Sequence, residues 1–160
     1  MLYPQLLAAD FARLPRALRE FHSAPRGGRA SGTAVVTHTN RWLAWLLGFP
    51  PSGENIPLQI EVQTSGNREI WVRQFGGVVL RTKQRQDGNL LLETRGLVRI
   101  FFRIFADEHG MRFESQRAYF WIIPLPLKVE ARVRGDESSW VVDVTVGRIG
   151  SYQGELVPVP

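Results

Sequence analysis

The chain has 160 residues, a length that fits one domain, and its 44% hydrophobic and 22% charged residues are ordinary for a globular protein. It contains no cysteine, which excludes disulfides, thiolate nucleophiles and cysteine-based metal sites. The net charge of +5 is common among nucleic-acid-binding proteins, but the arginines are scattered without a basic run, so we expect no functional nucleic-acid binding.

Neither a membrane-spanning nor a secretory segment is predicted. No apolar run approaches the roughly 20 residues that a transmembrane helix needs. The first residues, Met1-Leu2-Tyr3-Pro4, lack the basic-then-apolar pattern of a signal peptide. The expected location is therefore the cytoplasm.

Residues 1–50 form the predicted helical part of the chain. A short helix is expected over 3–9, and Pro15 suits the first turn of a second helix. The second helix carries an apolar stripe spaced at i, i+4 and i+7, which consists of Leu14, Leu18 and Phe21. His22 follows at the end of this helix, where a cation would be favourable.

A strand over 32–39 and a bulky helix over 41–47 complete this part. Asn40 is a suitable N-cap for the helix, whose apolar face carries Trp42 and Trp45. These rings are either a plug over the end of a sheet or an aromatic lid that closes one end of a cavity. Both interpretations stay open at the level of the sequence.

From residue 56 to residue 157 the chain is predicted to be a β meander. Eight or nine alternating segments follow one another with short turns, and Pro124-Leu125-Pro126 forces a corner between two of them. A meander of this length curls strongly or closes, because open edges invite aggregation. We therefore expect one α+β domain over 1–160, with N-terminal helices on a strongly curved, mostly antiparallel sheet or barrel. A helix-grip arrangement is the alternative.

One predicted strand face combines two large aromatic rings with a charge. Glu69, Trp71, Arg73 and Phe75 alternate with smaller residues and therefore point to the same side. An unpaired buried charge is costly, so Arg73 should be matched by Glu93 or Glu69. This face is the predicted lining of a ligand site. Tyr119 and Trp121 lie in phase on a later strand and are expected to form its opposite wall.

Short motifs are spread in order along nearly the whole chain. They are Leu14-Pro15 with His22, Gly48-Phe49-Pro50, Trp71-x-Arg73-x-Phe75-Gly76, Glu93 with Gly96, Pro124-Leu125-Pro126, and Tyr152-x-Gly154-x-Leu156. In these motifs the chain resembles a bacterial family known only as domain of unknown function 4166. The resemblance implies a domain that stands alone or is fused to others, including dehydrogenase-like nucleotide-binding domains. It implies no activity.

Three classes of function fit the sequence. The first is a binding module whose curved sheet encloses a small apolar or amphipathic ligand. The second is an interaction domain for a separate oxidoreductase-like partner, since this chain has no G-x-G-x-x-G motif of its own. The third is an enzyme that uses Arg73 and a glutamate. The histidines are isolated from one another, so no metal site or cofactor is predicted. The sequence does not define an oligomeric state.

Overall fold

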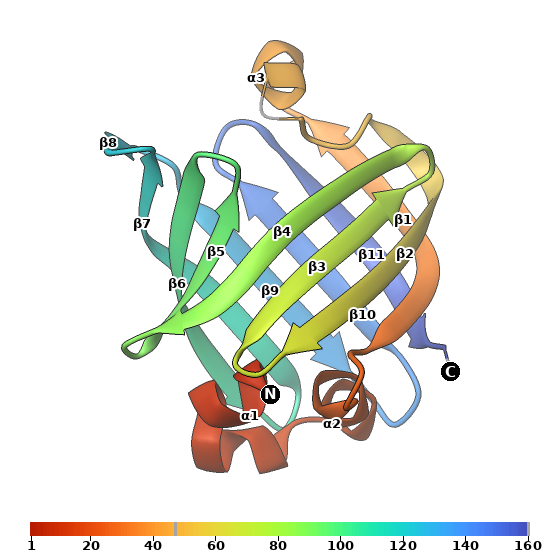
Figure 1. The fold of residues 1–160 in the computed structure, drawn as a ribbon. Helices are drawn as coiled ribbons and strands as arrows, with labels where there is room; N and C mark the ends of the chain where they lie inside the picture. The colour runs from red at the N-terminus through yellow and green to blue at the C-terminus, as the bar shows by residue number, and fades with distance from the viewer. Residues whose placement is uncertain (47, 160) are drawn as a thin grey trace.

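Ten antiparallel strands close into a barrel whose two ends carry the helices (Figure 1). The computed structural model describes residues 1–46 and 48–159. The barrel strands are β1 (Arg29–His38), β2 (Gly53–Ser65), β3 (Arg68–Phe75), β4 (Val78–Asp87), β5 (Leu90–Arg95), β6 (Val98–Asp107), β7 (Gly110–Phe120), β9 (Val129–Gly135), β10 (Trp140–Val146) and β11 (Gly150–Pro158). The helices are α1 (Leu2–Leu7), the 3-10 helix η1 (Ala8–Arg13), α2 (Arg16–Ser23) and α3 (Arg41–Leu46).

The strand order follows the chain. Each barrel strand pairs with the next barrel strand along the chain, β6–β7 and β7–β9 included, and β1 pairs with β11 to close the ring. A short strand, β8 (Ile123–Leu125), pairs only with β7 and carries Pro124, which fits an edge position. The prediction of a curved antiparallel barrel with N-terminal helices is confirmed. It has more strands than the predicted eight or nine, because β1 joins the meander and β8 adds an edge.

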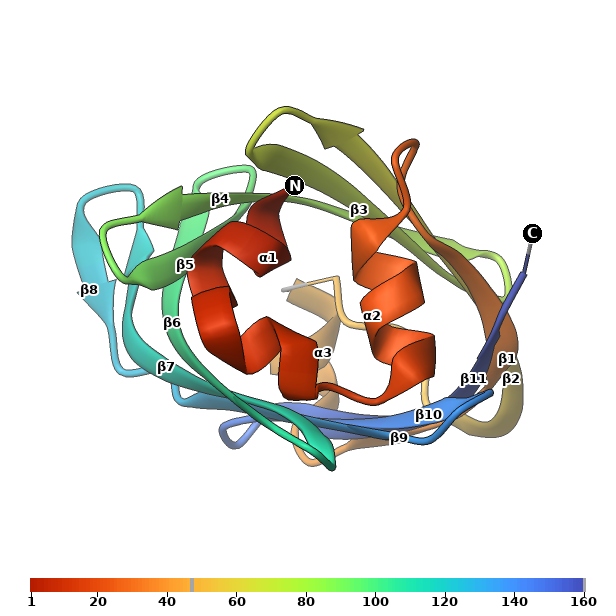
Figure 2. The same cartoon turned by 90° about the horizontal axis from the view of Figure 1, so that it is seen from below.

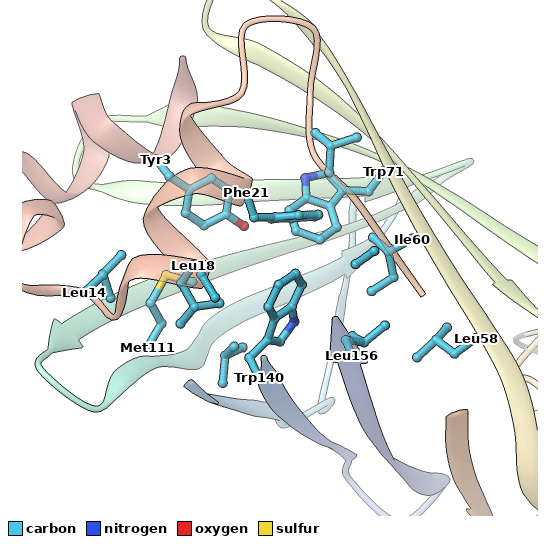
Figure 3. Packing of buried hydrophobic residues seen from close by; sticks show 14 of the residues in the cluster. Tyr3, Leu14, Leu18, Phe21, Leu58, Ile60, Trp71, Met111, Trp140 and Leu156 are labelled. Carbon is cyan, nitrogen blue, oxygen red and sulfur yellow. The ribbon is translucent and has the colours of Figure 1, made fainter. Parts of the chain in front are cut away.

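The N-terminal helices plug one end of the barrel (Figure 2). The predicted stripe of Leu14, Leu18 and Phe21 is buried, as expected. The Phe21 ring lies 5.0 Å from Trp140 and 5.8 Å from Trp71, measured between centroids, so α2 packs against strands on opposite sides of the interior (Figure 3). The helices thus cover the barrel end rather than being wrapped by the sheet, which differs from a helix-grip arrangement.

α3 lies at the opposite end of the barrel, in the connection from β1 to β2 (Figure 1). Asn40 caps it by accepting a hydrogen bond from the backbone N–H of Leu43 (3.0 Å). The expected last helical position, 47, lies outside the described residues. Trp42 and Trp45 are 64% and 75% exposed, so the expectation that they form a plug or lid is wrong. Among the side chains of α3 that the structure describes, the small Ala44 is the buried one, and the two tryptophan rings are exposed.

A bulge in β7 reverses the face of its last residues. Arg117 pairs with Phe101 and Ser115 with Phe102, which leaves Gln116 as an extra residue. Beyond the bulge Ala118 is buried opposite Ile100, so Tyr119 points outward and stacks on the Arg99 guanidinium, 5.6 Å away. Trp121 lies in the next turn and is mostly exposed. The expectation that Tyr119 and Trp121 form an inner wall is therefore wrong.

None of the helices in the described part of the chain is long and apolar enough to cross a membrane. In the plug, Leu18 of α2 is almost completely buried.

We expect Leu18→Ala to lower the free energy of unfolding by about 2–4 kcal/mol, because it leaves a cavity at the plugged end of the barrel. Arg19→Ala, on the exposed side of the same helix, should change it by less than about 0.5 kcal/mol. Chemical denaturation followed by tryptophan fluorescence measures both. Equal effects would show that α2 does not stabilise the barrel.

Candidate functional site

The barrel encloses a cavity of about 230 Å³ between the helical plug and the end that carries α3. Most of its wall is apolar, and β9 and β10 contribute only apolar side chains to it. The residues of these two strands that line it are Val129, Ala131, Val133, Trp140, Val142, Val144 and Val146. They all lie on the inward face, because alternate residues of a strand point to the same side. This wall therefore suits an apolar body.

Polar side chains gather on the opposite wall, where the register of β3, β4 and β5 brings them together. Arg73 donates from Nη1 to Thr82 Oγ1 (3.0 Å) and to Glu93 Oε1 (3.2 Å). Gln84 donates from Nε2 to the other Glu93 oxygen (2.9 Å), and the Tyr3 hydroxyl of α1 donates to Gln84 Oε1 (2.9 Å). A continuous hydrogen-bond network thus runs from the plug to Arg73.

Arg73 and Glu93 form a half-buried ion pair inside the barrel. Their side chains are 15% and 19% exposed, and both line the cavity. Burial alone would lower the pKa of Arg73, but the charge and hydrogen bond of Glu93, together with the nearby Tyr152 and Tyr3, outweigh burial and raise this pKa above its usual value. The guanidinium also lies 4.9 Å from the Trp71 ring centroid, a cation–π contact. The prediction that Arg73 points inward and meets a carboxylate is confirmed.

Glu69 is buried elsewhere in the interior. It accepts hydrogen bonds from Trp71 Nε1 (3.0 Å) and from the backbone N–H of Leu2, and burial raises the pKa of its carboxyl group. It does not line the cavity. Glu69 therefore anchors α1 to β3, and Glu93 is the carboxylate that faces the cavity.

His22 is a neutral group in the cavity wall. Its ring lies 4.0 Å from Tyr3 and 5.7 Å from Trp71, between centroids, and burial lowers its pKa to about 3. The expected cation at the end of this helix is therefore absent at neutral pH, because the ring is turned into the barrel instead of into solvent. The ring borders the cavity.

Two further polar side chains border the cavity. The Tyr152 hydroxyl has its pKa raised by burial, partly offset by the nearby Arg73 charge, and its ring packs against Phe75 (5.1 Å between centroids). Arg95 lines the cavity while being exposed, so it lies at the opening. It donates from Nη1 to the carbonyl of Gly48 (3.2 Å). The opening is therefore at the α3 end, opposite the plug.

The structure divides the nine predicted site residues into three groups. Trp71, Arg73 and Glu93 line the cavity together. Phe75 and Glu69 are buried in the interior behind it. The four that lie outside the cavity are Trp42, Trp45, Tyr119 and Trp121.

Sequence reasoning missed most of the polar lining. The missed residues are Tyr3, His22, Thr82, Gln84, Arg95 and Tyr152. The sequence could have predicted Thr82 and Gln84 as lining residues, because a two-residue hairpin turn after Phe75 places them opposite Trp71 and Glu69. No pattern in the sequence places Tyr3 or His22 inside the barrel, because that depends on how the plug docks.

Comparison with protein-family models, with curated proteins and with solved structures gave no match. The resemblance to the family of unknown function 4166 therefore stays a prediction. Among the described residues no group of three histidine, aspartate or glutamate side chains gathers in a way that could hold a metal ion. The class of protein is defined by the fold and the cavity: a closed antiparallel barrel with an amphipathic interior.

Arg73→Ala should lower the free energy of unfolding by roughly 3 kcal/mol, because it leaves Glu93 half-buried without its cation. Arg132→Ala, at an exposed position of β9, is the control and should cost less than about 0.5 kcal/mol. Arg73→Met combined with Glu93→Leu should recover much of the loss, since no charge stays unpaired. Urea denaturation of the four proteins decides. If Arg73→Ala lowers the free energy of unfolding only slightly, the Arg73–Glu93 pair contributes little to stability.

His22 predicts a pH dependence of stability. Its pKa is about 3 in the folded protein and about 6.5 in an unfolded chain, so the unfolded state holds more protons between these values. The contribution of neutral His22 to the free energy of unfolding is therefore fully present above about pH 6.5. It is lost as the pH falls, and the slope approaches about 1.4 kcal/mol per pH unit. His22→Phe, which keeps an aromatic ring among aromatic neighbours, should remove this slope between pH 6 and pH 5.

His109→Gln, in the exposed turn between β6 and β7, is the matched control and should leave the slope in place. Thermal unfolding at closely spaced pH values measures the slopes. If wild type and His22→Phe lose stability in parallel, His22 does not stay neutral in the folded protein.

Proposed function

We propose that this chain is a binding module that encloses a small amphipathic molecule in its barrel. The observation that carries the proposal is a mostly apolar cavity in which polar side chains gather on β3, β4 and β5, while β9 and β10 contribute only apolar ones. Protein sites for small molecules are concave, mostly apolar and supplied with a few convergent polar groups. Closed up-and-down barrels commonly use their interior in this way.

The polar wall favours a ligand with one oxygen-bearing end. Arg73 lines the cavity and uses Nη1 for Thr82 and Glu93, so the donors of Nε and Nη2 are left for a ligand. Tyr152 adds a hydroxyl close to this guanidinium. A carboxylate or carbonyl oxygen would meet both, and charge-assisted hydrogen bonds of this kind are the stronger ones. His22 is neutral and adds no competing charge.

The size of the cavity limits the apolar part of the ligand. Its volume of about 230 Å³ lies below the roughly 300–1,000 Å³ of pockets for drug-sized molecules. A short fatty acid, a small isoprenoid or a single-ring quinone fits this space better than a long-chain lipid. The opening beside Arg95 is its entrance, since the other end is filled by the plug.

Native mass spectrometry and solvent extraction of the purified protein test the proposal directly. We expect a copurifying small molecule or, after extraction, saturable quenching of tryptophan fluorescence by short fatty acids, isoprenoids or quinones. Trp71 and Trp140 line the cavity and should report the binding. No copurifying species together with no saturable quenching by any of these compounds would refute the proposal.

Partly filling the cavity should weaken ligand binding without harming the fold. Ala131→Phe adds a ring at a lining position, and we expect the affinity for the best ligand to fall about tenfold or more, since the ring occupies the space of the apolar body. Val35→Phe, at an exposed position of β1, adds similar bulk outside the barrel and should leave the affinity unchanged. Isothermal titration calorimetry measures both. Loss of binding in both variants would point to a general disturbance instead.

Two alternative functions, an accessory domain and an enzyme, are supported by fewer observations. An accessory domain for an oxidoreductase-like partner is compatible with the exposed apolar side chains at the open end. An enzyme would need a carboxyl group free to exchange protons with a substrate. Glu93 is already engaged by Arg73 and Gln84, and Glu69 lies outside the cavity.

A further inference from the structure

Large apolar side chains gather on the loops around the cavity opening. Those that are more than half exposed there are Trp42, Trp45, Leu97, Trp121, Ile122 and Ile123. They come from α3, from the β5–β6 turn and from the β7–β8 turn, all of which lie at the end opposite the plug (Figure 1). Near the plugged end, Met1, Phe105 and Val157 are each less than half exposed. We call the six residues at the open end the rim.

Hydrogen bonds tie the rim loops to one another and to the opening. Trp121 N–H donates to the carbonyl of Leu97 (2.8 Å), and the Arg99 guanidinium donates to the carbonyl of Trp121. Arg95 joins β5 to the α3 connection through Gly48. The rim is thus a fixed part of the barrel mouth. Trp121 itself has a φ of 54°, a backbone conformation that bulky residues rarely adopt.

The charge of the two barrel ends differs. The open-end segments 39–46, 48–54, 76–78, 95–99, 120–130 and 146–150 hold five arginines or lysines and two glutamates. The five cations are Arg41, Arg95, Arg99, Lys128 and Arg148. The plugged-end segments 1–28, 65–69, 85–90, 107–110 and 134–139 hold seven arginines and eight aspartates or glutamates. Positive charge therefore accompanies the exposed rings, while the other end is close to neutral.

We propose that the rim docks on the surface of an anionic lipid bilayer. Tryptophan is enriched at the membrane–water interface, and neighbouring lysines and arginines are attracted to anionic headgroups. The apolar side chains sit on separate loop tips around an opening, an arrangement that suits insertion between lipids better than a flat protein contact. Shallow docking by aromatic and cationic residues requires no membrane-spanning segment.

This orientation would place the cavity opening against the lipid. A small amphipathic molecule could then pass between the bilayer and the barrel without crossing water. That consequence rests on the proposed ligand-binding function. The docking itself does not, because it depends only on side chains outside the cavity.

Flotation with lipid vesicles tests the docking, using protein freed of any bound molecule by solvent extraction. We expect binding to vesicles of mixed phosphatidylcholine and phosphatidylglycerol, weaker binding to phosphatidylcholine alone, and loss of binding at high salt. Trp121→Ser combined with Ile122→Ser should lower the partition coefficient roughly tenfold or more, because two apolar side chains leave the interface. Phe105→Ser, near the plugged end, is the matched control and should leave it unchanged.

Variants that remove positive charge measure the electrostatic contribution to vesicle binding. Arg41→Gln with Arg148→Gln should weaken binding to anionic vesicles several-fold, whereas Arg19→Gln with Arg26→Gln at the plugged end should not. No vesicle binding, or binding that the rim variants leave unchanged, would overturn the proposal. A dimer that the rim variants dissociate, with no vesicle binding, would assign the rim to a second copy of the chain. Vesicle binding without ligand binding would refute the proposed function alone.

Discussion

The width of a ten-stranded closed barrel is the constraint on which the rest of the structure depends. A barrel of about eight strands is just narrow enough for inward side chains to fill it or to hold one small ligand. Two more strands enlarge the interior beyond what those side chains can occupy, so something else must fill it. The N-terminal helices do so at one end, where Phe21 reaches both Trp71 and Trp140. The space that they leave is the cavity.

The same width explains why charge is tolerated inside. Arg73 lies where the interior is only partly filled, so the guanidinium borders a cavity rather than close-packed hydrocarbon. Glu93 is held on the next strand but one. Gln84 donates to its second oxygen, and Tyr3 donates to Gln84, which extends the network to the plug. Among the described residues no buried side-chain nitrogen or oxygen is left without a partner. Docking of α1 and the geometry of the polar wall are therefore coupled.

Much of the fold follows from local patterns in the sequence. The period-two alternation of β3 correctly turns Glu69, Trp71 and Phe75 inward, and the apolar stripe of Leu14, Leu18 and Phe21 correctly predicts which side of the second helix is buried. The wrong predictions, for Tyr119 and for the tryptophans of α3, arise from single local features of the structure that the alternation of residues does not encode. The extra residue Gln116 turns Tyr119 to the outside, and a buried alanine in α3 turns its tryptophans outward.

The candidate site was harder to predict than the fold because it combines distant segments. Register across the β3–β4 turn brings Thr82 and Gln84 beside the predicted face, and that step is within reach of the sequence. Tyr3 and His22 enter from helices whose docking is decided only by the completed barrel. Arg73 with Glu93 could be anticipated from the cost of an unpaired charge, whereas the neutral state of His22 follows from burial alone.

The pairing of β1 with β11 has a consequence for how the chain folds. All other ladders of the barrel join strands that are neighbours in sequence, apart from the short β8 between β7 and β9, so they can form one hairpin after another. Only the ladder from Ala30–Pro158 to His38–Gly150 brings together segments far apart in the chain. Closing so large a loop costs conformational entropy, and this cost is offset only when the β1–β11 ladder forms. Before that moment the molecule is an open sheet with two unpaired edges, and the cavity does not yet exist.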